Sequence, residues 1–174
     1  HWGYGFPELA RDQRQKIASA KLVTNPGCYP TGFLSALRPL VDDNLLDHNA
    51  LLTITALSGY SGGGRKLIES YEARSAMFPD RLWPVRPYAL ELRHKHVPEM
   101  QLFASLANKP IFLPAVGQFF QGMLVSCPIH EQQLTRQTSL EAVQSILSDR
   151  YENEPCINVM PLNSESALDQ GFLD

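Results

Sequence analysis

Cysteine is scarce in this sequence: Cys28, Cys127 and Cys156 are the only three among 174 residues, and they lie far apart. An odd number of cysteines at wide spacing, without a CxxC pair, does not indicate a disulfide framework. Histidines and cysteines also lack the clustered spacing of a zinc finger. The sequence therefore predicts neither a disulfide-stabilised fold nor a metal site.

An excess of basic charge is absent too, since 15 lysine and arginine residues stand against 18 aspartate and glutamate residues, for a net charge of −3. This balance offers no polybasic surface for nucleic acid or for an anionic membrane. No apolar run approaches the roughly 18 to 20 residues that span a bilayer, and no signal-peptide pattern opens the chain. We expect a cytoplasmic protein without nucleic-acid or membrane partners.

The length of 174 residues, 44% of them hydrophobic, is typical of one domain with a sizeable core. The first residue is His1 rather than methionine, and it leads into a turn-like stretch, residues 2–7. The last residues, 168–174, carry no strand or helix pattern. We expect both ends to be cuts in a longer polypeptide.

Hydrophobic spacing predicts a mixture of helices and strands. The expected helices cover residues 7–20, 30–40, 66–77 and 97–107 and a segment after the capping sequence at 138–141. The expected strands cover residues 21–24, 51–57, 85–90, 111–113, 123–129 and 156–160. Because strands and helices do not alternate strictly, we predict an α+β fold.

The stretch NPGCYPTG, residues 25–32, places Cys28 just ahead of an expected helix, between two prolines and two glycines. Free backbone N–H groups at a helix start stabilise a thiolate, which is the nucleophilic form of cysteine. The same groups can hold the oxyanion that forms when a thiolate attacks a carbonyl. We therefore interpret Cys28 as a nucleophile, and Cys127 and Cys156, inside apolar strand patterns, as buried packing residues.

Two further segments favour acyl chemistry. The segment RHKHVPE, residues 93–99, holds two histidines and two cations that suit an acid–base group and an anionic substrate, although a solvated loop would look the same. The loop SGYSGGGR, residues 58–65, can turn its backbone N–H groups toward an anion, although it carries neither a Walker nor a dinucleotide fingerprint. A thiol, an imidazole pair and such a loop together fit acyl transfer through a thioester.

The sequence resembles the N-acetyl-gamma-glutamyl-phosphate reductases, in particular their second, shorter type. The stretch PGCYPT at 26–31 is the most specific part of this resemblance, which extends over roughly residues 1–130. The other matching stretches are YGFPEL at 4–9, SGYSGGGR at 58–65, HKHVPEM at 94–100 and GQFFQGM at 117–123.

The resemblance implies that Cys28 attacks the acyl phosphate N-acetyl-gamma-glutamyl phosphate in arginine biosynthesis. Phosphate leaves, and a hydride from NADPH reduces the thioester to N-acetylglutamate 5-semialdehyde. It implies His96 as the acid–base partner, with His94 as the rival.

The resemblance also assigns binding residues. Those for the substrate would be Arg65, Lys95, Arg93, Glu99 and Asn25. Those lining the site and approaching the nicotinamide would be Ser58, Gly59, Ser61 and Gly62.

The NADP-binding Rossmann domain of such enzymes is absent from residues 1–174, so the chain would be a single catalytic and dimerisation domain. Most of the cofactor site would lie in the missing domain, and we expect the isolated chain to be nearly inactive. The implied fold is that of the C-terminal domain of glyceraldehyde-3-phosphate dehydrogenase, a mixed, mostly antiparallel sheet with helices on one face. The implied assembly is a homo-oligomer, a dimer or tetramer, with strands near 123–129 as interface candidates.

Three other functions are compatible with the sequence. A related semialdehyde dehydrogenase would act on a different acyl phosphate. A cysteine hydrolase would need only the thiol and an imidazole, without a cofactor. A non-catalytic domain would carry an unreactive thiol at Cys28.

Overall fold

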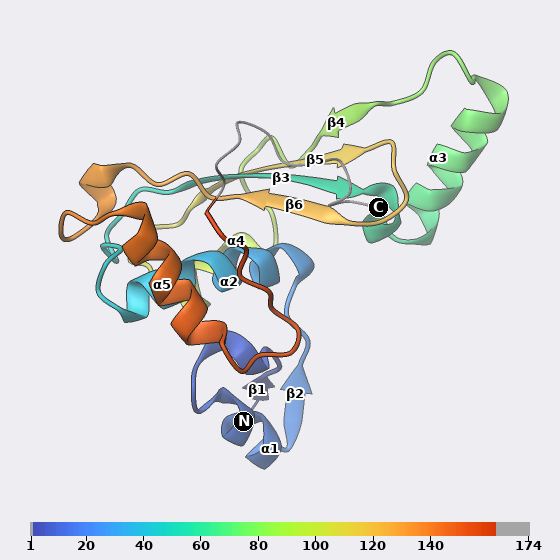
Figure 1. The fold of residues 1–174 in the computed structure, drawn as a ribbon. Coiled ribbons are helices and arrows are strands. Elements are labelled where there is room, and N and C mark those ends of the chain that lie inside the picture. The colour runs from blue at the N-terminus through green and yellow to red at the C-terminus, as the bar shows by residue number, and fades with distance from the viewer. Residues whose placement is uncertain (1, 163–174) are drawn as a thin grey trace.

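A computed structural model describes residues 2–162 (Figure 1). Its strands are β1 (Trp2–Tyr4), β2 (Leu22–Thr24), β3 (Thr53–Gly59), β4 (Val85–Pro87), β5 (Ile111–Gly117) and β6 (Met123–Ser126). Its α-helices are α1 (Gln13–Ser19), α2 (Cys28–Asp42), α3 (Arg65–Met77), α4 (Val97–Phe103) and α5 (Leu140–Tyr151). Three short 3-10 helices are η1 (Pro7–Leu9), η2 (Tyr60–Gly63) and η3 (Glu131–Gln133).

Four strands form the main sheet in the order β4-β5-β3-β6. The central pair β3 and β5 is parallel, and the two outer pairings are antiparallel. Helices α2, α4 and α5 lie on one face of this sheet, and α3 stands beyond the end at which β3 finishes (Figure 1). The predicted α+β class, with a mixed and mostly antiparallel sheet, is confirmed.

Alternation along the central strands explains why only one face of the sheet is covered. In β3, Ile54 and Ala56 are buried while Thr53 and Thr55 are exposed. In β5, buried Phe112 likewise alternates with exposed neighbours. Since successive side chains of a strand point to opposite faces, one face packs on helices and the other stays open.

Helix α2 fills the centre of the core. Its apolar residues recur every three or four positions, which places them on one side of the helix. These side chains are almost completely buried: Phe33, Leu34, Leu37 and Leu40. A helix buried along this stripe has little freedom to shift, so its first residue is held in a fixed place relative to the sheet.

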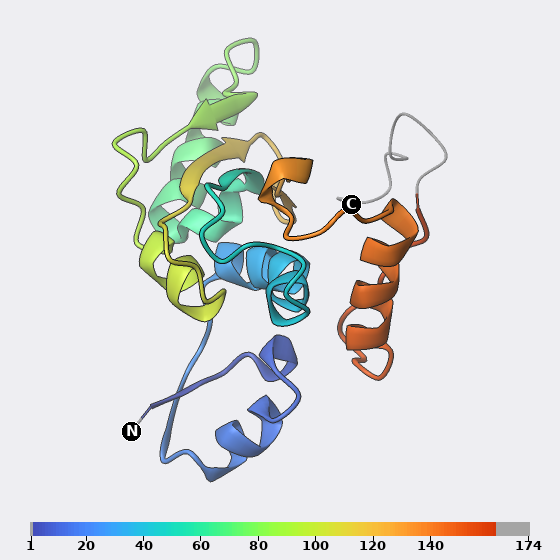
Figure 2. The same cartoon turned by 90° about the vertical axis from the view of Figure 1, so that its left-hand side faces the viewer.

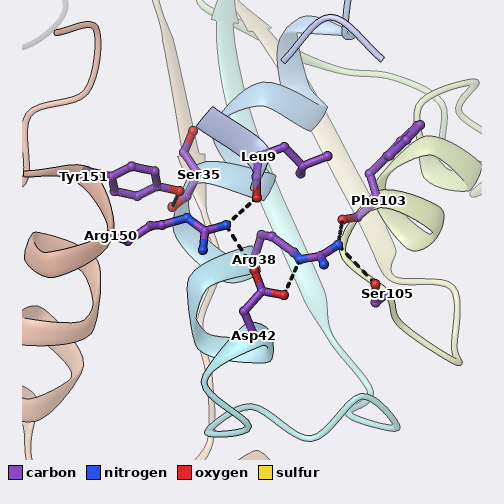
Figure 3. A network of polar contacts seen from close by, with 8 residues as sticks. All are labelled: Leu9, Ser35, Arg38, Asp42, Phe103, Ser105, Arg150 and Tyr151. Carbon is purple, nitrogen blue, oxygen red and sulfur yellow. Dashed lines mark hydrogen bonds and ion pairs between the residues drawn. The ribbon is translucent and has the colours of Figure 1, made fainter. Parts of the chain in front are cut away.

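Polar contacts fix α2 to three other segments (Figure 3). Arg38 pairs with Asp42 at 2.7 Å and donates to the Phe103 carbonyl of α4 at 2.7 Å. Arg150 of α5 contacts Asp42 at 3.0 Å and also donates to the carbonyl of Leu9 in η1. The helix is thereby tied to α4, to α5 and to the N-terminal segment at once.

The N-terminal segment forms a small lobe below the sheet (Figures 1 and 2). Strands β1 and β2 pair in parallel, with Gly3 opposite Val23. The side-chain amide of Gln13 in α1 donates to the Tyr4 carbonyl at 2.6 Å. This lobe delivers the chain from β2 directly into the start of α2.

Several predicted boundaries are wrong for local reasons. The single helix expected over 7–20 is two pieces, η1 and α1, because Ala10 between them takes an extended conformation. The turn-like residues 2–4 form β1. The strand expected over 85–90 ends at Pro87, before Ala89 adopts a positive φ of 51°.

Two further predictions, for the helix over residues 97–107 and for the strand over residues 156–160, are also wrong. The helix expected to reach residue 107 stops at Phe103, because Ser105 has a φ of 58°. Residues 156–160 form no strand; the Met160 carbonyl instead accepts from the Gln144 side chain of α5 at 2.9 Å. The expectation for residues 168–174 lies outside the described residues. Across the part that is described, no helix combines the length and the apolarity that crossing a membrane requires.

Candidate active site

Cys28 is the first residue of α2, because the helix begins two residues before the predicted start at residue 30, and its side chain is exposed. Gly27 is the N-cap, and Thr31 already donates its N–H to the Gly27 carbonyl at 3.0 Å. The N–H groups of Cys28 and Tyr29 belong to the first turn, where no intrahelical acceptor exists. The thiol therefore stands beside two N–H groups that lack an intrahelical acceptor, at the positive end of a helix, which favours negative charge there.

A cavity of about 530 Å³ opens next to this thiol. Its wall includes one row of residues across all four strands of the main sheet, the paired positions Arg86, Val116, Ser58 and Met123. Directly paired residues point to the same face, and buried Val116 marks it as the helix-covered one. The cavity thus lies between the start of α2 and the inner face of the sheet.

Three hydroxyl groups form a chain along the cavity wall. Tyr88 donates to the Tyr29 hydroxyl at 2.9 Å, and Tyr29 donates to the Ser58 hydroxyl at 2.9 Å. Burial, and next the hydrogen bond to Tyr29, raise the pKa of Tyr88 far above its ordinary value; the charge of Cys28 adds to the shift. Tyr88 therefore keeps its proton and remains a donor next to the thiol.

The two predicted histidines lie together behind this chain. Their ring centres are 4.8 Å apart, and His94 also packs edge-on against Tyr29 and Tyr88, at 5.8 and 5.7 Å. The ring of His96 abuts the backbone of Gly27, where an added Cβ would lie 2.6 Å from Nε2. His94 thus contacts the hydroxyl chain directly, and His96 contacts the residue just before the thiol. Neither imidazole lines the cavity itself.

Burial sets the protonation state of both imidazoles. It lowers the pKa of His94, and repulsion from His96 and Lys95 lowers it further. Burial likewise lowers the pKa of His96. The Nδ1 atom of His94 accepts the His96 backbone N–H at 3.2 Å, while Nδ1 of His96 is buried without a partner among residues 2–162. Both rings are neutral at pH 7 and able to accept a proton.

Glu99 has a different place from the one that the sequence suggests. The same carboxylate oxygen accepts the Gly27 N–H at 2.8 Å and the Tyr4 hydroxyl at 2.7 Å. Glu99 does not line the cavity. In the structure it joins α4 and β1 to the residue just before the thiol, and so it fixes the turn that positions Cys28.

The glycine-rich loop contributes four residues to the cavity wall, Ser58, Gly59, Ser61 and Gly62. Its N–H groups are less available than expected. Those of Gly59, Tyr60 and Ser61 donate to carbonyls in the turn between β5 and β6. These three groups hold the loop against the sheet, and they are not free to bind an anion.

The predicted cations stand outside this cavity. Arg65, at the start of α3, is 90% exposed and pairs with Glu69 at 2.7 Å. Arg93, Lys95 and Asn25 are exposed and do not line the cavity either. The charged residue that does line it, Arg86, was missed because its side-chain direction depends on how β4 pairs with β5.

The other two cysteines differ from each other. Cys127 is partly buried and packs against the core, and desolvation raises the pKa of its thiol to about 12. Cys156 is exposed, which corrects the expectation that it is buried in a strand. Among residues 2–162, no three histidine, cysteine, aspartate or glutamate side chains gather closely enough to hold a metal ion.

Comparison with known proteins gives a consistent set of matches. The family model for "semialdehyde dehydrogenase, dimerisation domain" matches residues 28–170. Proteins named N-acetyl-gamma-glutamyl-phosphate reductase from Brucella ovis and Brucella canis are each 45% identical over 168 residues. That alignment covers 96% of this chain and 54% of each relative, so the chain spans about half the length of the curated relatives it matches.

Solved structures agree on the fold. A crystal structure of aspartate semialdehyde dehydrogenase II from Vibrio cholerae superposes with a TM-score of 0.65 at 17% identity. The superposition covers 85% of this chain and 49% of that one. A second structure of the Vibrio cholerae enzyme, described as complexed with ASA, gives the same TM-score at 14% identity.

The contact between Gly27 and His96 leads to a stability prediction. Gly27→Ala should cost about 1–3 kcal/mol in the free energy of unfolding, because the new methyl group has to displace the imidazole or the start of α2. Gly62→Ala is the matched control, since its Cβ would meet nothing within 4 Å, and it should change stability by less than about 1 kcal/mol. Urea denaturation measures both, and equal destabilisation would contradict the contact.

Stability should also depend on the two partly buried imidazoles, His94 and His96. Their pKa values are lowered on folding, so the unfolded chain binds more protons than the folded chain below the ordinary histidine pKa of about 6.5. Their contribution is therefore complete above that pH and is lost as the pH falls.

The test is urea denaturation between pH 7.5 and 5 of the wild type, His94→Gln, His96→Gln and the double variant. Each single substitution should flatten the fall in stability, and the double variant should flatten it most. An unchanged pH dependence in the double variant would contradict this account.

Proposed function

Because the chain belongs to the family of semialdehyde dehydrogenase dimerisation domains, we propose that it is the catalytic and dimerisation part of an N-acetyl-gamma-glutamyl-phosphate reductase. The observation that carries the proposal is the position of Cys28, an exposed thiol at the first residue of a buried helix, facing a cavity. The substrate in this proposal is inferred from the names of the relatives. The type of reaction is inferred from the geometry around Cys28.

The reaction begins with attack of the Cys28 thiolate on the carbonyl carbon of the acyl phosphate. A carbon–sulfur bond forms, the bond from carbon to the phosphate oxygen breaks, and inorganic phosphate leaves with the electron pair. The free N–H groups at the start of α2 stabilise first the thiolate and then the oxyanion of the tetrahedral intermediate. The chain is left carrying a thioester on Cys28.

The imidazole pair supplies the acid–base group in this proposal. His96 is the first candidate because its ring contacts Gly27, which directly precedes the thiol. His94 is the rival because it packs on Tyr88 at 5.7 Å, and Tyr88 reaches the cavity. Both imidazoles are neutral at pH 7, so either can take the thiol proton before the attack and return it to the Cys28 thiolate when the aldehyde leaves.

The residues at the cavity wall fit a flat nicotinamide ring. A Cβ built on Gly62 meets no atom within 4 Å, so there is open space beside the loop, and Ser58 and Ser61 can offer hydroxyl groups. NADPH, when bound, supplies the hydride that reduces the thioester to the aldehyde. The rest of the dinucleotide would be held by the half of the enzyme that residues 1–174 do not include, and the isolated chain would therefore turn over poorly.

The partner surface in this proposal is the open face of the sheet. Its exposed apolar residues include Ile111, Leu113 and Leu124, on the central strand β5 and the edge strand β6. An exposed apolar sheet face is typical of a protein interface. The description of the family as a dimerisation domain supports a homo-oligomer that buries this face.

The cytoplasm is the compartment that suits this chemistry. The nucleophile has to stay reduced, and cytosolic glutathione and thioredoxin keep exposed thiols reduced. All three cysteines of the chain are free in the structure.

The proposal is tested in the full-length enzyme that contains this chain, by NADP-dependent and phosphate-requiring oxidation of N-acetylglutamate 5-semialdehyde. Cys28→Ser should lower the rate by about 10³-fold or more, because a serine hydroxyl is a far weaker nucleophile here. Cys156→Ser replaces the other exposed thiol and is the matched control, with an unchanged rate expected.

Full activity of Cys28→Ser would overturn the mechanism. Wild-type activity on a different semialdehyde alone would keep the mechanism and replace the substrate. Release of the acyl group as a free acid without nicotinamide would favour a cysteine hydrolase.

A further inference from the structure

Both backbone groups of Gly27, the residue before the thiol, are held by other side chains or by the helix. Its N–H donates to the Glu99 carboxylate at 2.8 Å. Its carbonyl accepts the N–H and the hydroxyl of Thr31, each at 3.0 Å. Because a glycine backbone is otherwise free to rotate, these contacts set the direction of the peptide that follows. That peptide carries the N–H of Cys28, one of the donors at the start of α2.

The Glu99 carboxylate needs a second contact to stay in this position, because a glutamate side chain has several rotatable bonds. Among residues 2–162, no cationic side chain lies within 4.0 Å of it. The second contact is the hydroxyl of Tyr4, which donates at 2.7 Å to the same oxygen that accepts the Gly27 N–H. Tyr4 and Gly27 therefore hold Glu99 between them.

Tyr4 is itself fixed at both ends of its side chain. Its ring, in the small N-terminal lobe, stacks on the ring of Phe103 with centres 3.5 Å apart and planes 12° apart. Phe103 lies four residues after Glu99 in α4, so Tyr4 lies along one side of that helix. The Tyr4 carbonyl accepts the side-chain amide of buried Gln13 at 2.6 Å. The hydroxyl thus has a fixed place from which to donate.

The protonation state of Tyr4 suits a permanent donor. Burial, and next the hydrogen bond to Glu99 and its negative charge, raise the pKa of the Tyr4 hydroxyl far above its ordinary value. The hydroxyl keeps its proton at every pH at which the enzyme would work. Tyr4 does not line the cavity beside Cys28, so any effect on the reaction must pass through Glu99 and Gly27.

We propose that Tyr4 is a positioning residue for acyl transfer: it holds Glu99, which holds Gly27 and so aims the Cys28 N–H at the oxyanion. This inference rests on the proposed function only in that a thiolate attacks a carbonyl carbon; the identity of the acyl group does not enter it. The N-terminal lobe then has a role in the chemistry, through a side chain that never touches the substrate.

The test compares two reactions of Cys28 in the full-length enzyme. With p-nitrophenyl acetate, the thiolate attacks the carbonyl carbon, a carbon–sulfur bond forms, the ester carbon–oxygen bond breaks and p-nitrophenolate leaves. This route passes through an oxyanion that the N–H donors stabilise. With iodoacetamide, the thiolate displaces iodide from a CH₂ group, and no oxyanion forms. The ratio of the two rates therefore reports on the donors and not on the thiol alone.

Both rates are followed by mass spectrometry of the Cys28 peptide from pH 6 to 9, and their limiting values at high pH compare fully ionised thiols. Tyr4→Phe keeps the stack on Phe103 and removes only the hydroxyl. It should slow acylation about 10-fold or more, since a displacement of about 1 Å can cost roughly 100-fold in rate. Alkylation should stay unchanged.

Tyr151→Phe is the matched control. The Tyr151 hydroxyl also anchors α2 over a long distance in sequence, because it donates to the Ser35 carbonyl at 2.9 Å, but it is not connected to Gly27. Both rates should stay unchanged in this variant. Equal slowing of acylation and alkylation in Tyr4→Phe, the mark of a merely structural role, would overturn the proposal. So would unchanged acylation in Tyr4→Phe, or a wild-type Cys28 that is alkylated and never acylated.

A double-mutant cycle tests whether Tyr4 acts through Glu99. Glu99→Ala removes the acceptor of both hydrogen bonds and should slow acylation at least as much as Tyr4→Phe does. Adding Tyr4→Phe to Glu99→Ala should then have no further effect. Glu99→Gln keeps an acceptor oxygen, and its rate should lie between those of the wild type and Glu99→Ala. Independent, multiplying effects of the two substitutions would contradict the route through Glu99.

Failure of the proposed function gives a separate result. If the wild-type enzyme does not oxidise N-acetylglutamate 5-semialdehyde while acylation of Cys28 still depends on Tyr4, the substrate is rejected and the positioning role stands. If the oxidation proceeds and acylation does not depend on Tyr4, the proposed function stands and the positioning role is rejected.

Discussion

The burial of helix α2 is the constraint on which the rest of the structure depends. Phe33 and Leu34 are completely enclosed, and Arg38 and Arg150 tie the helix to its neighbours. A helix held in this way presents its first residue at a fixed point above the sheet. Glu99 then fixes the preceding turn through the Gly27 N–H. The thiol itself can stay exposed, because its position is set by the buried side chains of α2 and by Glu99.

In the proposed reaction, the chemistry lies at one end of the cavity. Backbone donors at the start of α2 would stabilise the charge that develops at the reacting carbon, and the neutral imidazoles would move protons there. Arg86, on the edge strand β4, is the charged residue among the described residues that line the cavity. The open face of the sheet takes no part in this site, which leaves it available for a second copy of the chain.

Local chemistry was predictable from the sequence, and tertiary pairing was not. The prolines and glycines around Cys28 carry the strand-to-helix turn in a few consecutive residues, and the loop after Leu57 is equally local. Arg86 and Tyr88 were missed because only the register of β4 on β5 places them on the inner face. Their spacing of two residues within the strand expected over residues 85–90 was the signal that could have found them. The role of Glu99 depends on a contact between segments more than 70 residues apart in sequence.

The central claim is that Cys28 carries the acyl group. The most direct measurement mixes the full-length enzyme with N-acetylglutamate 5-semialdehyde and NADP⁺ without phosphate, quenches the mixture in acid and maps its peptides by mass spectrometry. The account predicts an N-acetylglutamyl thioester on the Cys28 peptide that disappears when phosphate is added before the quench. Turnover with no adduct there, or with the adduct on Cys156 or another residue, would contradict it.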